Sequence, residues 1–288
     1  MKFTFWGTRG SIPTPSNPQT PTEEYGGDTT CVSLEWGQDG LLIVDAGTGI
    51  RRAGFHWMKS GRKNFTLLFT HAHWDHLQGF PFFAPAYLEG NTIEILSPCL
   101  PNRPPGNLIQ KALHAQQEAP YFPAGFPELK AKITFREVQP GEEMKFASGK
   151  EVVRVQSAPT RHPGGCFAYR FDGPGRGGER SLVFATDNEP PIDPSTPLIK
   201  LTSGADLLVC DGQYTDEEHE KRHGWGHGTP SLCLQEAVVA KAKRLLVTHF
   251  DPGHPDGQLE CMEDNLIAAG RKQGVDAAFA RQNQVIEL

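Results

Sequence analysis

A chain of 288 residues is long enough for one large domain or two small ones, at roughly 100–200 residues per domain. Hydrophobic residues make up 38% of it and charged residues 22%, a balance that excludes a disordered chain and favours a buried core. The net charge of −6 at pH 7 argues against general, charge-driven binding to nucleic acid, although a local basic patch stays compatible with it.

Signals for targeting, membrane insertion and disulfide formation are missing from the sequence. The first eleven residues include Arg9 and polar side chains where a secretory signal needs an apolar run of about 7–15 residues. No uncharged apolar stretch approaches the roughly 20 residues of a membrane-spanning helix, and the six cysteines form no C-x-x-C pair. We therefore expect a soluble, cytoplasmic protein without membrane contact, disulfide framework or thiolate metal site.

Strand signals run along the whole chain as short stretches rich in β-branched and aromatic residues. Residues 1–6 open the chain, and residues 31–36 and 41–44 predict a hairpin around Gln38-Asp39-Gly40. Further strands are predicted at residues 65–70, 92–96, 132–138, 151–156, 165–171, 181–185, 206–210, 244–248 and 284–288. Apolar residues recur every three or four positions at residues 108–117, 231–243 and 259–273, which predicts helices there.

This order of elements predicts two sheets packed together with helices outside. The 31 glycines and 24 prolines supply many turns, and the Pro-rich stretches at residues 12–21 and 98–106 are expected to be surface loops. Because the sequence has no repeat and no Ser/Gly linker, residues 1–288 are predicted to form a single domain.

The densest chemical signal follows directly after a predicted apolar strand. Within six residues the chain carries four metal-ligand side chains, namely His71, His73, Asp75 and His76. Alternate residues of an extended segment project to one side, so His71 and His73 can share one cation, while a turn beyond Trp74 brings Asp75 and His76 to a second. Imidazole and carboxylate ligands suit zinc, iron or manganese. The alternative is a solvated or pH-sensitive loop, but four such residues this close together favour metal binding.

Three further ligand-type residues lie beside predicted strands later in the chain: His162, Asp187 and His249. Each of them alone is equally compatible with a loop residue, and an aspartate at such a position commonly caps a turn. Taken together, they complete two metal sites.

The H-x-H-x-D-H element with its later His, Asp and His resembles the metallo-β-lactamase superfamily over nearly the whole chain. The resemblance implies the α/β class, as a four-layer αββα sandwich of two mixed β-sheets that holds metals at one sheet edge. It also implies two divalent metal ions, zinc before manganese or iron. The implied ligands are His71, His73 and His162 for one ion, Asp75, His76 and His249 for the other, and Asp187 as a bridge between them.

Asp45 resembles the first conserved acid of that family, and two roles stay open for it. It could orient the ligand loop by hydrogen bonds, or it could cap the turn Ala46-Gly47-Thr48-Gly49.

The resemblance also indicates an activity. Members with Asp at the bridging position usually cleave phosphodiesters or thioesters, whereas antibiotic-cleaving members usually carry Cys there. Two cations about 3.5–4 Å apart lower the pKa of a shared water and neutralise both oxygens of a phosphoryl displacement. Residues 3–11 and the run Gly226-His227-Gly228-Thr229-Pro230 look like the branch of tRNA 3′-end endonucleases and small phosphodiesterases.

His227 and Asp75 are the predicted catalytic residues. By resemblance, His227 contacts the scissile phosphate and is the acid for the leaving oxygen, although a plain loop role between Gly226 and Gly228 is the alternative. Arg161, His223 and His254 are left open as substrate contacts. Loop aromatic residues offer surfaces for a base or sugar, namely Trp74, Phe80, Tyr121, Phe122 and Trp225, with core packing favoured for Phe80 and Phe122.

The sequence departs from the endonucleases in three ways. Of their paired histidine and glutamate, the histidine is replaced by Cys210 and only an acid survives, as Asp211. The 24 residues between His162 and Asp187 are too few for an RNA-binding arm, and the chain is acidic. We therefore expect a small-molecule phosphodiester substrate, such as a cyclic nucleotide or cyclic ribose phosphate, with nucleic acid less favoured. The alternatives are an RNA 3′-end endonuclease, a lactonase or thioesterase, and a non-enzymatic metal-dependent sensor. A homodimer is expected by resemblance.

Overall fold

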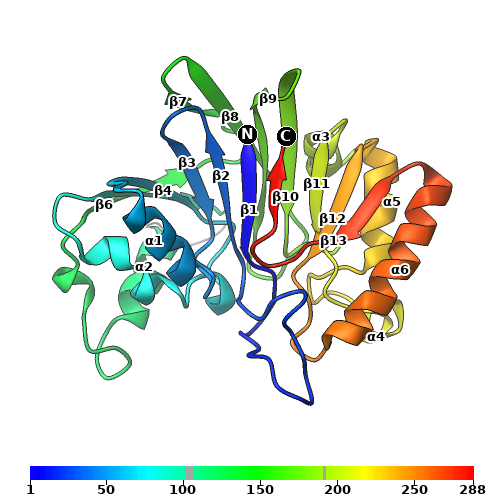
Figure 1. Cartoon of the computed structure of the whole chain (residues 1–288), viewed down its shortest axis with the longest axis horizontal. Helices are drawn as coiled ribbons and strands as arrows, with labels where there is room; N and C mark the ends of the chain where they lie inside the picture. The colour runs from blue at the N-terminus through cyan, green and yellow to red at the C-terminus, as the bar shows by residue number, and fades with distance from the viewer. Residues whose placement is uncertain (101–106, 191–192) are drawn as a thin grey trace.

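The computed structural model describes residues 1–100, 107–190 and 193–288, so most of the predicted loop at residues 98–106 lies outside the described residues. Two seven-stranded mixed sheets face each other and helices cover their outer faces, which confirms the predicted four-layer sandwich (Figure 1). In the first sheet the order is β14 (Val285–Glu287), β1 (Lys2–Gly7), β2 (Cys31–Trp36), β3 (Gly40–Val44), β4 (Asn64–Leu68), β5 (Thr92–Pro98) and β6 (Lys132–Val138).

The second sheet has the order β13 (Asp276–Phe279), β12 (Arg244–Thr248), β11 (Leu207–Asp211), β10 (Gly178–Ala185), β9 (Phe167–Gly175), β8 (Glu151–Pro159) and β7 (Met144–Ser148). A central core fills the space between the sheets, with Phe3, Leu42, Phe171 and Phe184 among its fully buried members. Burial of such side chains contributes roughly 1.5–3 kcal/mol each, so this layer holds the two sheets face to face.

Each outer face has its own helices and its own apolar core. Helices α1 (Ile50–Lys59) and α2 (Leu108–Gln116) pack on the first sheet, where Trp57 is almost fully buried. Helices α3 (Pro197–Thr202), α5 (Pro230–Ala240) and α6 (Asp256–Gln273) pack on the second sheet, and the short α4 (Asp216–Glu220) lies below α6 in the view of Figure 1.

All the predicted strands are present. Strands β2, β6 and β12 have the predicted ends and the others have shifted ends. Apart from short 3₁₀-helices, the described elements that were not predicted are α1, β7, α3, α4 and β13. The predicted helix at residues 231–243 ends earlier, at Ala240, because Lys241 adopts a left-handed conformation with φ 56° and closes the helix. The helix predicted to begin at residue 259 begins at Asp256, directly after Pro255.

Parallel pairing brings several strand ends to one edge of the sandwich. Strands β3 and β4 are parallel in the first sheet, and β10, β11 and β12 are parallel in the second. Strand β8 runs antiparallel to β9, which runs antiparallel to β10, so β8 ends at the same edge as β10. Open α/β sheets place their sites at the carboxyl ends of such strands, and every predicted ligand follows one of these ends.

Strands β9 and β10 form a tight hairpin. Gly175 pairs with Gly178 across it, and only Arg176 and Gly177 connect them. Residues 163–186 therefore contain no projecting arm. None of the described helices is both long enough and apolar enough to cross a membrane.

Candidate metal centre

The predicted ligand loop follows β4 directly and carries its ligands inward. His71, Asp75 and His76 are buried, whereas His73 is exposed. The short 3₁₀-helix η1 (Trp74–His76) supplies the turn that separates the two pairs of side chains. The extended run before it projects His71 and His73 to one side, as the alternation predicted.

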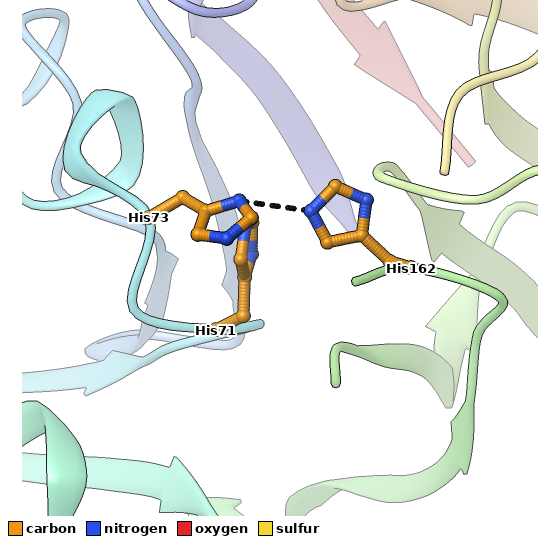
Figure 2. A group of neighbouring side chains, drawn as sticks. All are labelled: His71, His73 and His162. Atoms are coloured by element: carbon orange, nitrogen blue, oxygen red, sulfur yellow. Dashed lines mark hydrogen bonds between the residues drawn. The ribbon is translucent and has the colours of Figure 1, made fainter. Parts of the chain in front are cut away.

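The first group consists of His71, His73 and His162. Figure 2 shows these three imidazoles turned toward one another, two from the loop after β4 and one from the segment after β8. His162 Nε2 lies 2.9 Å from His73 Nδ1, and the ring centroids of His71 and His73 are 4.5 Å apart. The ligand atoms of all three lie within 4.8 Å of one another, close enough for one ion.

The second group consists of Asp75, His76 and His249, all buried. Asp75 Oδ2 lies 3.3 Å from the Nε2 atoms of both His76 and His249. His249 follows β12 with φ 67°, a left-handed conformation that is strained for a residue with a side chain.

Asp187 lies between the two groups and presents one carboxylate oxygen to each. Its Oδ1 is 3.7 Å from His71 Nε2 and 3.8 Å from His162 Nε2. Its Oδ2 is 3.2 Å from His76 Nε2 and 3.5 Å from His249 Nε2. This division of its two oxygens is the arrangement that a bridging carboxylate requires.

Unpaired buried atoms show that these residues fit a pair of cations. Among the described residues, His71 Nε2, His76 Nε2 and Asp187 Oδ2 are buried and have no hydrogen-bond partner. A buried polar atom without a partner costs about 1–3 kcal/mol, and here three of them converge. Imidazole nitrogen with carboxylate oxygen is a donor set suited to zinc, iron or manganese, so a dinuclear centre accounts for atoms that the protein alone leaves unsatisfied.

The shifts in pKa around the centre are also consistent with a bound cation. Burial lowers the pKa of His71 well below its ordinary value, which keeps its imidazole neutral and able to bind a metal. For His249 burial also acts to lower the pKa, but the carboxylates of Asp187 and Asp211 outweigh it and raise the pKa to about 9. The buried carboxylates of the centre therefore favour a cation there.

Three hydrogen bonds hold ligand imidazoles by the ring nitrogen that faces away from the centre. His76 Nδ1 lies 2.8 Å from Asp45 Oδ2, His249 Nδ1 lies 3.0 Å from Gln213 Oε1, and His162 Nδ1 lies 3.0 Å from Gly226 O. Such partners fix the ring orientation and leave the other nitrogen free to bind a metal.

Asp45 takes the first of the two roles left open for it. Besides bonding His76, its carboxylate accepts hydrogen bonds of 2.8 Å from the backbone N–H and the hydroxyl of Thr70. Gly49 is the N-cap of α1, which has no side-chain cap, so Asp45 does not cap the turn that precedes this helix.

His227 lies beside the centre and is held by a carboxylate that the sequence analysis noted only as a surviving acid. His227 Nδ1 is 2.7 Å from Asp211 Oδ2 and 4.0 Å from Asp187 Oδ1. Asp211 also accepts the backbone N–H groups of Asp187 and Gln213, each at 3.0 Å. Burial acts to lower the pKa of His227, but the Asp211 and Asp187 carboxylates reverse this and raise it.

Other residues singled out in the sequence lie in different surroundings. His254 is buried with Nε2 3.0 Å from Glu218, and Arg161 is exposed. Phe80 belongs to the apolar core, as favoured for it. Three of the candidate stacking residues are strongly exposed, namely Trp74, Tyr121 and Trp225. Trp74 directly follows His73, and Trp225 directly precedes Gly226.

Residues 42–250 match a family model described as Beta-lactamase superfamily domain. Among curated proteins, Ribonuclease Z of Prochlorococcus marinus (strain MIT 9515) is 25% identical over 305 aligned positions, which cover 90% of this chain and 91% of that protein. Ribonuclease BN of Proteus mirabilis (strain HI4320) is 22% identical over 293 positions, covering 87% and 89% of the two chains.

Solved structures show the same fold. The metallo-beta-lactamase fold protein YhfI from Bacillus subtilis has a TM-score of 0.69 at 20% identity and covers 100% of this chain and 98% of its own. The short form of human tRNase Z (ELAC1) has a TM-score of 0.65 at 21% identity, covering 100% and 99%. A diphosphatase from the PhnP family has a TM-score of 0.66 at 18% identity, covering 100% and 97%.

Proposed function

The chain belongs to the metallo-β-lactamase superfamily, and from that premise we propose that it is a metal-dependent phosphodiesterase with two divalent ions, zinc before manganese or iron. The observation that carries this proposal is Asp187, which presents a separate oxygen to each of two histidine groups. One ion would be held by His71, His73 and His162, the other by Asp75, His76 and His249, and Asp187 would be shared.

Such a metal pair would stabilise the charge on a phosphoryl centre as a Lewis acid, and it would lower the pKa of a water molecule to near neutral pH. The protein's own contribution is position and proton supply. Asp75 bonds to His249 and faces His76, which fixes the second ligand group. His227 is held by Asp211 and lies at the edge of both groups, where an imidazole with a raised pKa can carry the proton that a leaving oxygen needs.

The substrate class has two candidates, each favoured by a different observation. An RNA 3′ end is supported by curated relatives named Ribonuclease Z that align over about nine-tenths of the chain. A small phosphodiester, such as a cyclic nucleotide or cyclic ribose phosphate, is supported by the tight β9–β10 hairpin and by the net charge of −6, since binding a large polyanion depends on cationic contacts. Because these relatives align over most of the chain, we test the RNA end first.

One panel of substrates tests both the phosphodiesterase activity and the substrate class. Purified protein loaded with zinc or manganese is assayed on bis(p-nitrophenyl) phosphate, cyclic nucleotides, precursor tRNA, a thioester and a lactone. Turnover of a phosphodiester that chelation abolishes and metal restores is the expected result. Precursor tRNA cleavage that weakens steeply with salt favours the RNA end. Turnover of only the thioester or lactone contradicts the phosphodiesterase assignment.

The homodimer expected by resemblance stays a prediction. Light scattering of the eluting peak in size-exclusion chromatography would give the molar mass, and a monomer over the working concentration range would contradict it.

A further inference from the structure

A second cluster of metal-ligand side chains lies outside the centre described above. It consists of Glu189, His219 and His223, whose ligand atoms lie within 4.8 Å of one another. Glu189 follows β10, His219 is on α4, and His223 is in the loop that leads to His227. None of these three belongs to the predicted ligand set.

The spacing inside the cluster is that of ligands around an ion. Glu189 Oε1 lies 3.4 Å from His219 Nε2 and 3.4 Å from His223 Nδ1. Two donor atoms at about 2.0–2.1 Å from one tetrahedral ion are roughly 3.4 Å apart. The His223–Glu189 contact is also a hydrogen bond, but a long one, since a good N–H···O bond is nearer to about 2.9 Å. The main centre has the same spacing, with 3.3 Å between Asp75 Oδ2 and His76 Nε2.

An unpaired buried atom supplies an independent reason for a ligand here. The residue His219 is only 8% exposed, and its Nε2, which faces Glu189, is buried without a hydrogen-bond partner among the described residues. Glu189 is also 8% exposed, and its other oxygen, Oε2, already accepts the Gly224 N–H at 2.9 Å. Oε1 is therefore oriented toward the two imidazoles.

The exposure of the cluster and its donor atoms together indicate which class of ion it would bind. His223 has an exposed side chain, so a fourth position is available to water. Two imidazoles and one carboxylate suit zinc and its neighbours among the divalent transition metals more than calcium or magnesium, which prefer oxygen ligands.

From this geometry we propose that Glu189, His219 and His223 form a third, solvent-open site for a zinc-class divalent ion. The ion joins three separate segments of the chain: the one after β10, α4, and the loop that holds Gly226 and His227. Because Gly226 O holds His162 and His227 faces the main centre, an ion at the third site steadies this loop against the centre. Its role is positional, and the two-metal centre does not depend on it for ligands.

The test counts ions per chain in the full-length protein. Wild type, His223→Gln and the control His56→Gln are equilibrated by dialysis against buffered free Zn²⁺, and bound zinc is measured by mass spectrometry. His223 and His56 are both exposed, so neither substitution threatens folding. We expect three ions in wild type and His56→Gln and two in His223→Gln. Equal zinc content in wild type and His223→Gln overturns the third site, whatever the total is.

Amide hydrogen exchange gives a second readout that does not depend on activity. Because zinc fills the main centre in both proteins, zinc addition should slow exchange across residues 222–228 more in wild type than in His223→Gln, which lacks only the third site. An unchanged loop in wild type at saturating zinc would contradict the positional role. Since the readout is the difference between two proteins, failure of phosphodiesterase activity would leave it intact and interpretable.

Discussion

The two halves of the metal centre are built differently. The first sheet contributes four predicted ligands from one loop of six residues after β4, whereas the second contributes the predicted ligands His162, Asp187 and His249 from three separate strand ends. The first half is therefore set by local chain geometry and the second by strand pairing. A contiguous motif therefore identifies the chemistry, but the pairing of strands in the mixed second sheet is needed to complete the site.

Each half also has a supporting carboxylate, and these two carboxylates hold different histidines. Asp45 follows β3 and bonds to His76, a predicted ligand, at 2.8 Å. Asp211 ends β11 and bonds to His227, which is outside the two predicted ligand groups, at 2.7 Å. We therefore expect Asp45 to strengthen metal binding and Asp211 to orient the proton-donating imidazole of His227. The following substitutions test this contrast, the largest expected effect first.

The largest effect is expected for Asp187→Asn, because this residue serves both groups. The variant loses one of the two anionic oxygens that face the histidines, so we expect bound metal to fall and phosphodiester turnover to drop below detection. Metal content and kcat are measured together, with the exposed Asp264→Asn as a matched control. Full turnover by Asp187→Asn after metal reconstitution would refute the bridging assignment.

His227→Gln and Asp211→Asn should separate proton supply from metal binding. Loss of a positioned general acid lowers turnover by about 10²–10⁴-fold, and loss of its carboxylate partner by about 10–100-fold. Both variants should retain the metal content of wild type. Loss of an ion from either one would show that Asp211 and His227 act as ligands, an alternative that their grouping with Asp187 and His249 allows geometrically.

Asp45→Asn should give the reverse pattern. The amide cannot hold His76 and Thr70 as the carboxylate does, so metal affinity is expected to fall by about 10–100-fold. Competition with a chelator of known affinity measures this, and turnover at saturating metal should recover most of its wild-type value. If affinity is unchanged while saturated turnover collapses, the contrast between the two supporting carboxylates is wrong.

The smallest effect on activity is expected for the substitution Glu236→Gln. Glu236 is a buried acid of α5 and has no imidazole partner in the described structure. Burial raises its pKa to about 8, whereas in the unfolded chain it titrates near its ordinary value of 4.5. The unfolded state therefore releases this proton first, and the free energy of unfolding falls as pH rises from about 4.5 to about 8.

Glu236→Gln removes that dependence. The variant should match wild type near pH 4 and become more stable than wild type by pH 8, by a few kcal/mol at most. Urea denaturation at several pH values measures the difference. A stability gap that does not widen with pH would contradict the buried neutral form of Glu236.

The first half of the predicted centre has a sequence signal that is local. Four ligand-type side chains within six residues, after an apolar strand, leave few structural alternatives. Asp187, His162 and His249 were assigned through resemblance, since each alone looks like a loop residue; the structure brings all three together with the first half. No spacing rule joins Asp211 to His227, sixteen residues apart, because their contact arises from the end of β11 meeting a separate loop.

Other features were missed for the same reason. Gln213, which holds His249, has no distinctive sequence spacing, and neither has the cluster of Glu189, His219 and His223, apart from the four-position spacing of its two histidines. The predicted strands depended on strong apolar runs, whereas β7 and β13 are short edge strands with weak patterns. Helix α1 buries Ile50, Ala53 and Trp57, whose three- and four-residue spacing is visible in the sequence.

The most direct test of the two-metal centre is the location of bound ions in a crystal of the zinc-loaded protein. Anomalous diffraction at the zinc edge should show, apart from any peak at the proposed third site, two peaks at this centre about 3.5–4 Å apart. One should lie within the His71, His73 and His162 group and one within the Asp75, His76 and His249 group, with Asp187 between them. A single peak, or two peaks that do not share Asp187, would contradict the assignment.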